Sequence, residues 1–196
     1  IAGVETIKHA LSYIIYQLAL NPQVQNQLSA ELESTLQSNN DTMNYKALIS
    51  MPYLNNVVKE GLRLHSPTTV LDRRCAQACT INAKLPHEKD IKLNVNDWVW
   101  IPHDAMHYDL KYYSDPEKFN PDRYDHEHNN NYTFLPFGIG PRNCIGSRFA
   151  ILEIKLFLTE VLQHYEIQLC DNDKLCKKRY FGEPLWVQLY PKIKNV

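Results

Sequence analysis

Half of the chain's six glycines fall within nine residues, and this density constrains the fold more than any other feature of the sequence. The run reads Phe-Gly-Ile-Gly-Pro-Arg-Asn-Cys-Ile-Gly, from Phe137 to Gly146. Gly138 and Gly140 permit tight turns and the close approach of a bulky, flat group to the backbone. Cys144 comes at the start of an apolar helical pattern, where unpaired amides and the helix dipole favour a thiolate. The run therefore predicts a turn that presents a thiolate to such a group.

Two interpretations of Cys144 are open on these residues. In the first, its thiolate is the single axial ligand of a haem iron and Gly146 flanks it. Phe137 then packs beside the sulfur and excludes water, and Arg142 meets a haem propionate. In the second, Cys144 is an ordinary small buried residue in a glycine-rich turn. The pattern Phe-x-x-Gly-x-Arg-x-Cys-x-Gly fixes five residue types across ten positions, so it favours the haem ligand.

The chain is predicted to be mainly α, with small β elements. Apolar residues recur at helical spacing in four segments. Asn21 and Pro22 are expected to be the N-cap and the first residue of the second helix. The helix after Cys144 is apolar on most sides and is therefore expected to be buried. The predicted helices are 1–20, 22–37, 54–64 and 145–164.

Seven of the eleven prolines lie between Pro67 and Pro141, and they exclude long helices from that stretch. Residues 109–133 have no periodicity and are expected to form a long ordered loop, of a kind that usually has a function. Short β-branched and aromatic runs predict strands. No internal repeat or domain boundary is evident, so a single domain is expected. The predicted strands are 75–81, 98–101, 165–169 and 185–190.

The composition excludes several classes of protein. A chain of 196 residues that is 44% hydrophobic can bury a core, which excludes a disordered tail. The net charge of -1 and the absence of a basic patch exclude nucleic acid as an expected partner. Five cysteines, without a repeating framework, indicate a reducing compartment rather than a disulfide scaffold. No stretch approaches the roughly 18 apolar residues that cross a bilayer.

The histidines and cysteines offer another kind of metal site, in a zinc-supported binding module. Their paired spacings suit zinc, but no recognisable set of four ligands is present. Histidines in polar loop sequence are normally solvated, so the residues favour haem over zinc. The pairs are His103 and His107, His126 and His128, and Cys75 and Cys79.

Through Phe137, Gly140, Arg142, Cys144 and Gly146 the chain resembles the cytochrome P450 family of haem-thiolate monooxygenases. The resemblance implies that the cysteine is the proximal ligand of heme b, iron protoporphyrin IX. It also implies that residues 1–196 are the carboxy-terminal portion of a single domain whose amino-terminal portion is absent from this sequence. The implied elements are a long oxygen-groove helix, a Glu-x-x-Arg helix, a meander, the cysteine loop and the buried helix.

Glu60 and Arg63 carry opposite charges three residues apart on one helix face. Taken alone, such a pair is usually solvent-exposed and contributes little to stability. In the resembled family it is locked by an arginine from a downstream Phe-x-Pro-x-Arg, which matches Phe119 to Arg123 here. The resemblance implies that Glu60, Arg63 and Arg123 are buried together and support the cofactor site.

The segment Ala2-Gly-Val-Glu-Thr resembles the family's oxygen-groove motif. This implies that Thr6 supplies a hydroxyl near dioxygen and that Glu5 assists proton delivery. The alternative is a helix kink with an ordinary capping hydroxyl. The apolar faces of residues 1–20 and 145–164, which would meet haem and helices outside this sequence, are expected to remain exposed.

Further positions resemble cofactor and substrate contacts of the family. Arg73 is placed like an arginine that pairs with a haem propionate, although the adjacent Arg74 is an alternative. Residues 66–71 resemble a substrate-lining strand, and residues 178–182 a second lining turn. The implied lining residues are Thr68, Thr69, Val70 and Leu71.

The resemblance implies an oxidoreductase that inserts one atom of dioxygen into a small apolar organic substrate, xenobiotic or lipid-like. The electrons are expected from a separate NADPH-dependent reductase. The style of the motifs resembles microsomal eukaryotic members, which implies the cytosolic face of the endoplasmic reticulum membrane and an amino-terminal anchor outside this sequence. A different expectation is that the chain is a truncated fragment, catalytically inert on its own, that begins partway along the oxygen-groove helix.

Overall fold

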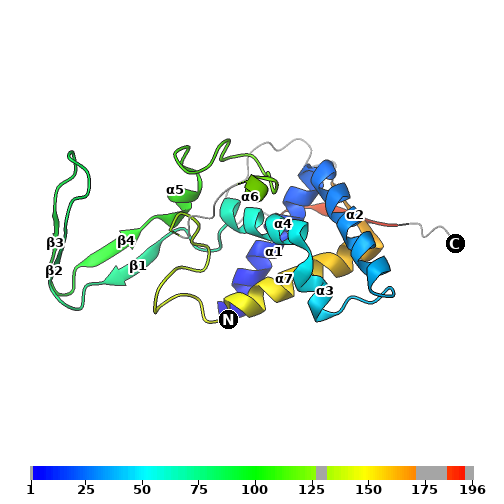
Figure 1. Ribbon diagram of the computed structural model, residues 1–196, viewed down its shortest axis with the longest axis horizontal. Helices are drawn as coiled ribbons and strands as arrows, with labels where there is room; N and C mark the ends of the chain where they lie inside the picture. The colour runs from blue at the N-terminus through cyan, green and yellow to red at the C-terminus, as the bar shows by residue number, and fades with distance from the viewer. Residues whose placement is uncertain (1, 127–131, 171–184, 193–196) are drawn as a thin grey trace.

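The computed structural model describes residues 2–126, 132–170 and 185–192. It has two visible parts, a body of packed helices and a β arm that extends from one end of it (Figure 1). The body is formed mainly by four helices that contact one another. They are α1 (Ala2–Leu20), α2 (Pro22–Ser38), α4 (Pro52–Leu64) and α7 (Ser147–His164).

These four helices confirm the four that the sequence predicts, although α4 begins two residues earlier than expected. The structure also contains short helices of one or two turns, too short for apolar periodicity to predict. One of them lies inside the stretch 109–133, which was expected to be only loop. The short helices are α3 (Tyr45–Ser50), α5 (His103–His107) and α6 (Arg123–His126).

Asn21 occupies the N-cap position of α2, but its side chain does not cap that helix. The amide Nδ2 instead donates to the carbonyl oxygen of Gln17 at 2.8 Å, near the end of α1. The expected N-cap position of Asn21 and the expected first residue Pro22 are therefore confirmed, although the Asn21 side chain bonds to α1 instead of capping α2. The physical reason is that α1 ends where α2 begins, so the unpaired carbonyls of α1 lie within reach of the same side chain.

The strands form three antiparallel pairs, β1 with β4, β2 with β3, and β5 with β6. The predicted strands 98–101 and 165–169 are confirmed, and the predicted strand 185–190 is shifted by one or two residues. The predicted strand 75–81 is confirmed only in part, because residues 79–81 form β2 whereas residues 75–78 lie in the turn between β1 and β2. The strands are β1 (Leu71–Arg74), β2 (Cys79–Ile81), β3 (Ile91–Leu93), β4 (Trp98–Ile101), β5 (Tyr165–Leu169) and β6 (Val187–Pro191).

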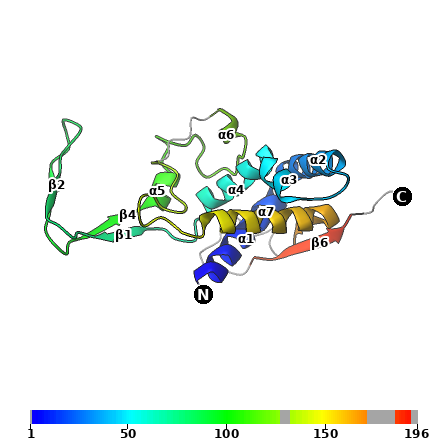
Figure 2. The same cartoon turned by 60° about the horizontal axis from the view of Figure 1, so that its bottom comes forward.

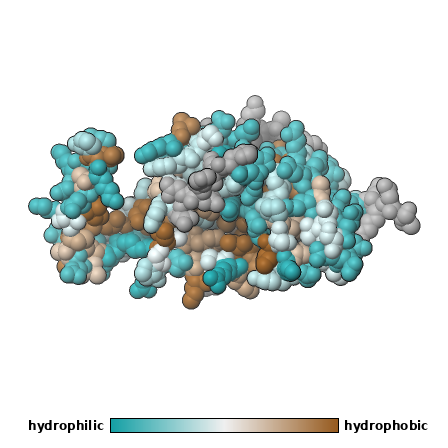
Figure 3. Space-filling model, in the orientation of Figure 1, coloured by the Kyte–Doolittle hydropathy of each residue, from teal (hydrophilic) through white to brown (hydrophobic). Residues whose placement is uncertain are grey.

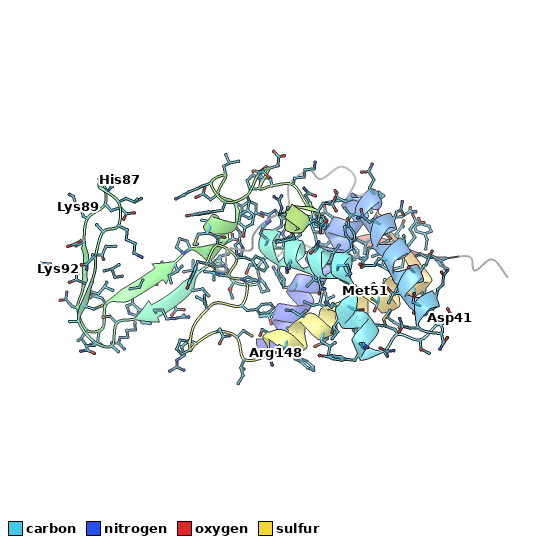
Figure 4. All side chains as sticks on the ribbon, in the orientation of Figure 1. Asp41, Met51, His87, Lys89, Lys92 and Arg148 are labelled. Carbon is cyan, nitrogen blue, oxygen red and sulfur yellow. The ribbon has the colours of Figure 1, made fainter. Side chains whose placement is uncertain are left out.

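The first two pairs make up the β arm, and the β2–β3 hairpin lies at its far end (Figure 1). His87, Lys89 and Lys92 lie on this hairpin, well away from the helices (Figure 4). The third pair, β5–β6, lies against the helical body, where β5 contacts α1 and α7 (Figure 2). The arm therefore projects from the body, whereas the third pair is part of it.

The hydrophobic core lies between α1, α2, α4 and α7, with Ile167 of β5 also buried in it. Two polar side chains join the elements around this core. The Gln25 amide accepts from the Ile167 N–H at 2.7 Å and donates to its carbonyl at 2.9 Å, which ties β5 to α2. The Glu31 carboxylate accepts from the N–H groups of Tyr53 and Leu54 at 2.7 and 2.8 Å, which caps the start of α4.

Gly61 marks a close approach between α4 and α1. A Cβ atom at this position would overlap Cγ1 and Cδ1 of Ile14, a stiff β-branched side chain that is itself fully buried. We expect Gly61→Ala to lower the free energy of unfolding by about 1–3 kcal/mol, because overpacking outweighs the better helix propensity of alanine. Urea denaturation of the two proteins measures the difference.

A double-mutant cycle separates this overlap from other effects of the substitution. In an Ile14→Ala background the overlapping atoms are gone, so Gly61→Ala should be neutral or stabilising. Gly3→Ala is a matched control, since a Cβ on Gly3 of α1 meets nothing within 4 Å. An equal loss from Gly61→Ala in both backgrounds would contradict the explanation.

Candidate functional site

The glycine-rich run folds back on itself immediately before α7. Gly138 and Gly140 have φ angles of 71° and 82°, in the left-handed region that side chains disfavour. The Asn143 N–H donates to the Gly140 carbonyl at 3.1 Å, and the Cys144 N–H donates to the Phe137 carbonyl at 2.8 Å. The turn that the glycines predict is therefore present, and it fixes the backbone of Cys144 against that of Phe137.

Cys144 lies two residues before Gly146, the N-cap of α7, and its side chain is exposed. The interpretation of Cys144 as a small buried residue is therefore wrong. Ile145 and Phe149 beside it are exposed at 105% and 67%. Hydrophobic side chains gather on the face shown in Figure 3, over the loop before α7 and the neighbouring helices. The loop thus presents a thiol on an open apolar surface.

The helix α7 is only partly buried, which corrects the expectation that it would be buried on most sides. Ile154 and Leu158 face the core, whereas Leu156 and Phe157 are exposed. Val4 of α1 is exposed in the same way. Both helices have apolar side chains on two faces, and the described residues cover only one. This agrees with the expectation that apolar surface on residues 1–20 and 145–164 remains exposed.

Thr6 and Glu5 lie on the exposed first turns of α1. Glu5 accepts from Lys8 Nζ at 3.4 Å, in an ion pair that is exposed to solvent. The starts of α1 and α7 overlap in Figure 1 and are set apart in the turned view of Figure 2. Thr6 and the cysteine loop therefore lie at the same end of the helical body, on separate elements.

The pairing of β1 distinguishes Arg73 from Arg74. Side chains alternate along a strand, so Arg73 shares a face with Leu71. The Cδ atoms of Leu71 lie 3.8 and 3.9 Å from the position of a Cβ on Gly138, so this face is turned to the cysteine loop. Arg74 is on the other face, with its Cζ 5.9 Å from the centroid of the Trp98 ring. The geometry therefore brings Arg73, rather than Arg74, to the side of the loop.

The residues expected to line a substrate are only partly in a strand. Residues 67–70 are irregular, and β1 begins at Leu71. Thr68 Oγ1 lies 3.3 Å from Nε2 of the buried His103, and the Thr69 carbonyl accepts from the Asp104 N–H at 3.3 Å. Val70 is exposed. The second expected lining turn, at 178–182, lies outside the described residues.

A buried cluster beside the loop that follows α5 contains Glu60, Arg63 and Arg123. The Glu60 carboxylate accepts from Arg63 Nε and Nη2 at 2.8 and 2.9 Å. It also accepts from Arg123 Nε at 3.0 Å and from the Asn120 N–H at 3.0 Å. The side chains of Glu60 and Arg63 have no solvent exposure. The interpretation of Glu60 and Arg63 as a surface ion pair is therefore wrong.

The two guanidinium groups use their remaining donors on backbone carbonyls. Arg63 Nη1 donates to the His107 carbonyl at 2.7 Å, and Arg123 Nη1 donates to the Ser114 carbonyl at 2.9 Å. Burial alone would lower the pKa of Arg63, but the hydrogen bond and the charge of Glu60 raise it overall. The Arg63 guanidinium is thus held in its charged form, and the network fastens an irregular segment to α4.

His107 links this network to the cysteine loop. The sequence did not predict this connection. His107 Nε2 accepts from the Leu135 N–H at 3.1 Å, so the proton belongs on Nδ1, which lies 3.1 Å from the Arg63 carbonyl. The Leu135 carbonyl in turn accepts from the Gly138 N–H at 3.0 Å. The sequence showed His107 only as a possible zinc ligand or turn residue, because its partners are backbone groups far along the chain.

The stability of the fold is expected to fall with acid because His107 is buried in the neutral form. Burial first, then the nearby His103 and Arg63, lower the pKa of His107 to about 4. The unfolded chain binds this proton near pH 6.5, so stability is full above that pH and is lost as the pH falls towards 4. The loss from this group amounts to about 3 kcal/mol.

Urea denaturation between pH 7 and pH 4 measures this dependence. Burial also lowers the pKa of His65 to about 4, so His65 makes its own contribution to the dependence of stability on pH. The difference between the native protein and His107→Gln therefore isolates His107. If the free energy of unfolding falls with pH equally in the two proteins, His107 is not the group responsible.

Clustered metal ligands and a surface depression are two other arrangements that could form a site. Across residues 2–126, 132–170 and 185–192, no three His, Cys, Asp or Glu side chains gather in a way that holds a metal ion. The ring of His126 and the whole of His128 lie outside the described residues. A surface depression near Tyr108 and residues 115–118 contains none of the predicted site residues. The zinc interpretation thus gains no support from the described part of the chain.

The helices within the described ranges are each too short or too polar to cross a bilayer.

Comparison with known proteins identifies the fold to which these features belong. A sequence model of the family described as Cytochrome P450 matches residues 1–192. Cytochrome P450 9e2 of Blattella germanica is 43% identical over 186 residues, which cover 91% of this chain and 34% of that protein. Cytochrome P450 6B6 of Helicoverpa armigera is 39% identical over 175 residues, covering 88% and 34%. Cytochrome P450 3A7 of Homo sapiens is 38% identical over 184 residues, covering 92% and 35%.

The chain spans about a third of the length of these curated relatives. The match extends from the first helix through the buried Glu60 network to the cysteine loop and the last strand pair. This chain belongs to the cytochrome P450 family.

Proposed function

We propose that residues 1–196 are the carboxy-terminal portion of a single cytochrome P450 domain, in a haem-dependent monooxygenase. The enzyme inserts one atom of dioxygen into a small apolar organic substrate, xenobiotic or lipid-like. The observation that carries the proposal is the exposed thiol of Cys144, held by the turn between Gly138 and Gly140 at the start of α7. Family membership supports the same chemistry.

The residues around Cys144 fit heme b. A Cβ atom on Gly140 or Gly146 would meet nothing within 4 Å, so the backbone there is open to a flat group. Ile145 and Phe149 offer apolar contact to a porphyrin and exclude water from the sulfur. Arg142 of the same loop is exposed, and its guanidinium suits a propionate carboxylate. Arg73 suits a second propionate, because its strand face is turned to the loop.

When bound, haem would supply the chemistry that activates dioxygen, and a thiolate ligand would favour cleavage of the O–O bond. Cys144 would provide that thiolate, and the hydrogen bond from its N–H to the Phe137 carbonyl fixes the backbone from which its side chain projects. Thr6 holds a proton at Oγ1, and Glu5 assists proton delivery through its carboxylate. Thr68 to Leu71 orient the substrate with a mixed, mostly apolar wall.

The electrons come from a separate NADPH-dependent reductase, and the whole protein resides on the cytosolic face of the endoplasmic reticulum membrane. The resemblance of the motifs to microsomal members supports both statements, and an amino-terminal segment outside this sequence provides the anchor. Arg148 projects from the first turn of α7 (Figure 4) and is a candidate contact for an acidic reductase surface.

Carbon monoxide difference spectroscopy tests the proposed haem ligation. The full-length protein, reduced and exposed to carbon monoxide, should show the red-shifted Soret band of a thiolate-ligated haem. A band at the position of a histidine-ligated haem, or no haem uptake at all, would overturn the proposal.

A second candidate is that residues 1–196 alone are catalytically inert. The exposed apolar side chains of Val4, Phe149 and Phe157 favour it, because a complete site would cover them. Titration of this chain with haem should then give weak, non-stoichiometric binding. Tight binding at one haem per chain, followed by turnover with a reductase, would reject inertness.

A further inference from the structure

Two cysteines outside the candidate haem site lie at the corner of the β arm. Cys75 follows β1 and Cys79 begins β2, so the pair sits where the arm turns from one strand pair to the next (Figure 1). The Cys75 N–H donates to the Asp97 carbonyl, and the Cys75 carbonyl accepts from the Asn96 N–H, both at 2.8 Å. Cys79 is paired with Leu93 across β2–β3. Backbone pairing therefore holds both cysteines in place.

The thiols of these two cysteines belong to the same turn of the β arm. Cys75 Sγ lies 3.0 Å from the carbonyl oxygen of Gln77, so it points back over the turn that joins the two cysteines. Desolvation, and then the neighbouring Cys79 thiol, raise the pKa of Cys75, so the two side chains lie within range of each other. Both thiols are free, with Cys75 partly exposed and Cys79 exposed. The two thiols therefore lie at one turn of the β arm, accessible to solvent and within range of each other.

We propose that Cys75 and Cys79 form a reversible intrachain disulfide by exchange with a low-molecular-weight disulfide such as oxidised glutathione. The Cys79 thiolate attacks one sulfur of the reagent, whose S–S bond breaks and releases one glutathione thiolate. The Cys75 thiolate then attacks the Cys79 sulfur of the mixed disulfide and releases the second glutathione. The two cysteines lose two protons and two electrons, and the reagent is reduced to two thiols.

The order of attack follows from accessibility. Cys79 is the more exposed thiol, and reagents in solution reach it first. Desolvation and then the neighbouring Cys79 raise the pKa of Cys75, which disfavours its thiolate as the first attacking group. The new bond would cross-link the base of the β2–β3 hairpin to the end of β1. Since β1 carries Leu71 and Arg73, oxidation would stiffen the arm next to the candidate haem site.

Mass spectrometry of tryptic peptides tests the proposal directly. Cleavage after Arg74 and Lys84 places both cysteines in one peptide that holds no other cysteine. The reduced full-length protein is incubated with oxidised glutathione, quenched with an alkylating agent and digested. We expect this peptide to be unalkylated and about 2 Da lighter than its dithiol form, and to be restored by dithiothreitol. Peptide that carries only two alkylated thiols would overturn the proposal.

Single-cysteine variants show whether one thiol resolves the other. Cys75→Ser and Cys79→Ser should stop at the mixed disulfide, with a peptide about 305 Da heavier. The native protein should pass through that species to the intrachain disulfide, and faster in buffer than in urea, because the fold brings the thiols together. Accumulation of the mixed disulfide in the native protein to the level of the variants, or disulfide formation only in urea, would overturn the proposal.

Discussion

Replacing Cys144 with alanine is expected to abolish the red-shifted Soret band of the reduced, carbon monoxide-bound protein. The band depends on a thiolate opposite carbon monoxide, and in this loop Cys144 is the residue that can supply one. The loss should be complete rather than graded, because alanine has no donor atom. Difference spectra of the two full-length proteins, at equal protein concentration, measure it.

The same substitution should leave the fold nearly unchanged. The side chain of Cys144 is exposed, and its hydrogen bond to Phe137 is made by the backbone N–H, which alanine retains. We expect the free energy of unfolding of the haem-free protein to change by less than about 0.5 kcal/mol. Cys170→Ala is the matched control and should keep the shifted band. A normal band in Cys144→Ala would refute the ligand assignment.

Neutralising Glu60 by Glu60→Gln is expected to destabilise the protein by about 3–5 kcal/mol. The substitution keeps the size of the side chain but removes the one carboxylate that faces Arg63 and Arg123. Both guanidinium groups would stay buried without a compensating charge, and the glutamine amide cannot accept all four hydrogen bonds that Glu60 accepts. Urea denaturation at neutral pH measures the loss.

An exposed carboxylate supplies the control for this substitution. The Glu160 carboxylate lies 3.5 Å from His164 Nε2 on the surface of α7, so Glu160→Gln should change stability by less than about 1 kcal/mol. The loss from Glu60→Gln should also be insensitive to salt, because solvent ions do not screen a buried pair. Equal effects of the two substitutions would contradict the role of the buried network.

The Glu60 network and the cysteine loop are connected, so the predictions for Glu60→Gln and Cys144→Ala are not independent. Arg63 holds the His107 carbonyl, and His107 accepts from the Leu135 N–H at the entrance to the loop. Loosening the network is therefore expected to disturb the turn that fixes Cys144. We expect Glu60→Gln to weaken haem retention as well as stability, whereas Cys144→Ala should affect haem ligation alone.

Much of the framework could be predicted from the sequence because it depends on local patterns. Apolar spacing predicted the four long helices, and the density of glycine predicted the turn at Gly138 and Gly140. The short helices and the break after Arg74 could not be predicted in this way. The short helices are too short for apolar periodicity to show, and the β1–β4 pair ends where Cys75 bonds to the backbone of the distant Asn96–Asp97 turn.

The sequence by itself determined the family motifs, the order in which they occur and the residue types available for haem chemistry. Only the tertiary structure decided that Glu60 and Arg63 are buried, that Arg73 rather than Arg74 faces the loop, and that His107 links the two. Spacing along a helix or strand determines which side chains lie on the same face. Whether that face is buried depends on which other elements cover it. In the Glu60 network that covering includes Arg123, which is 63 positions away along the chain.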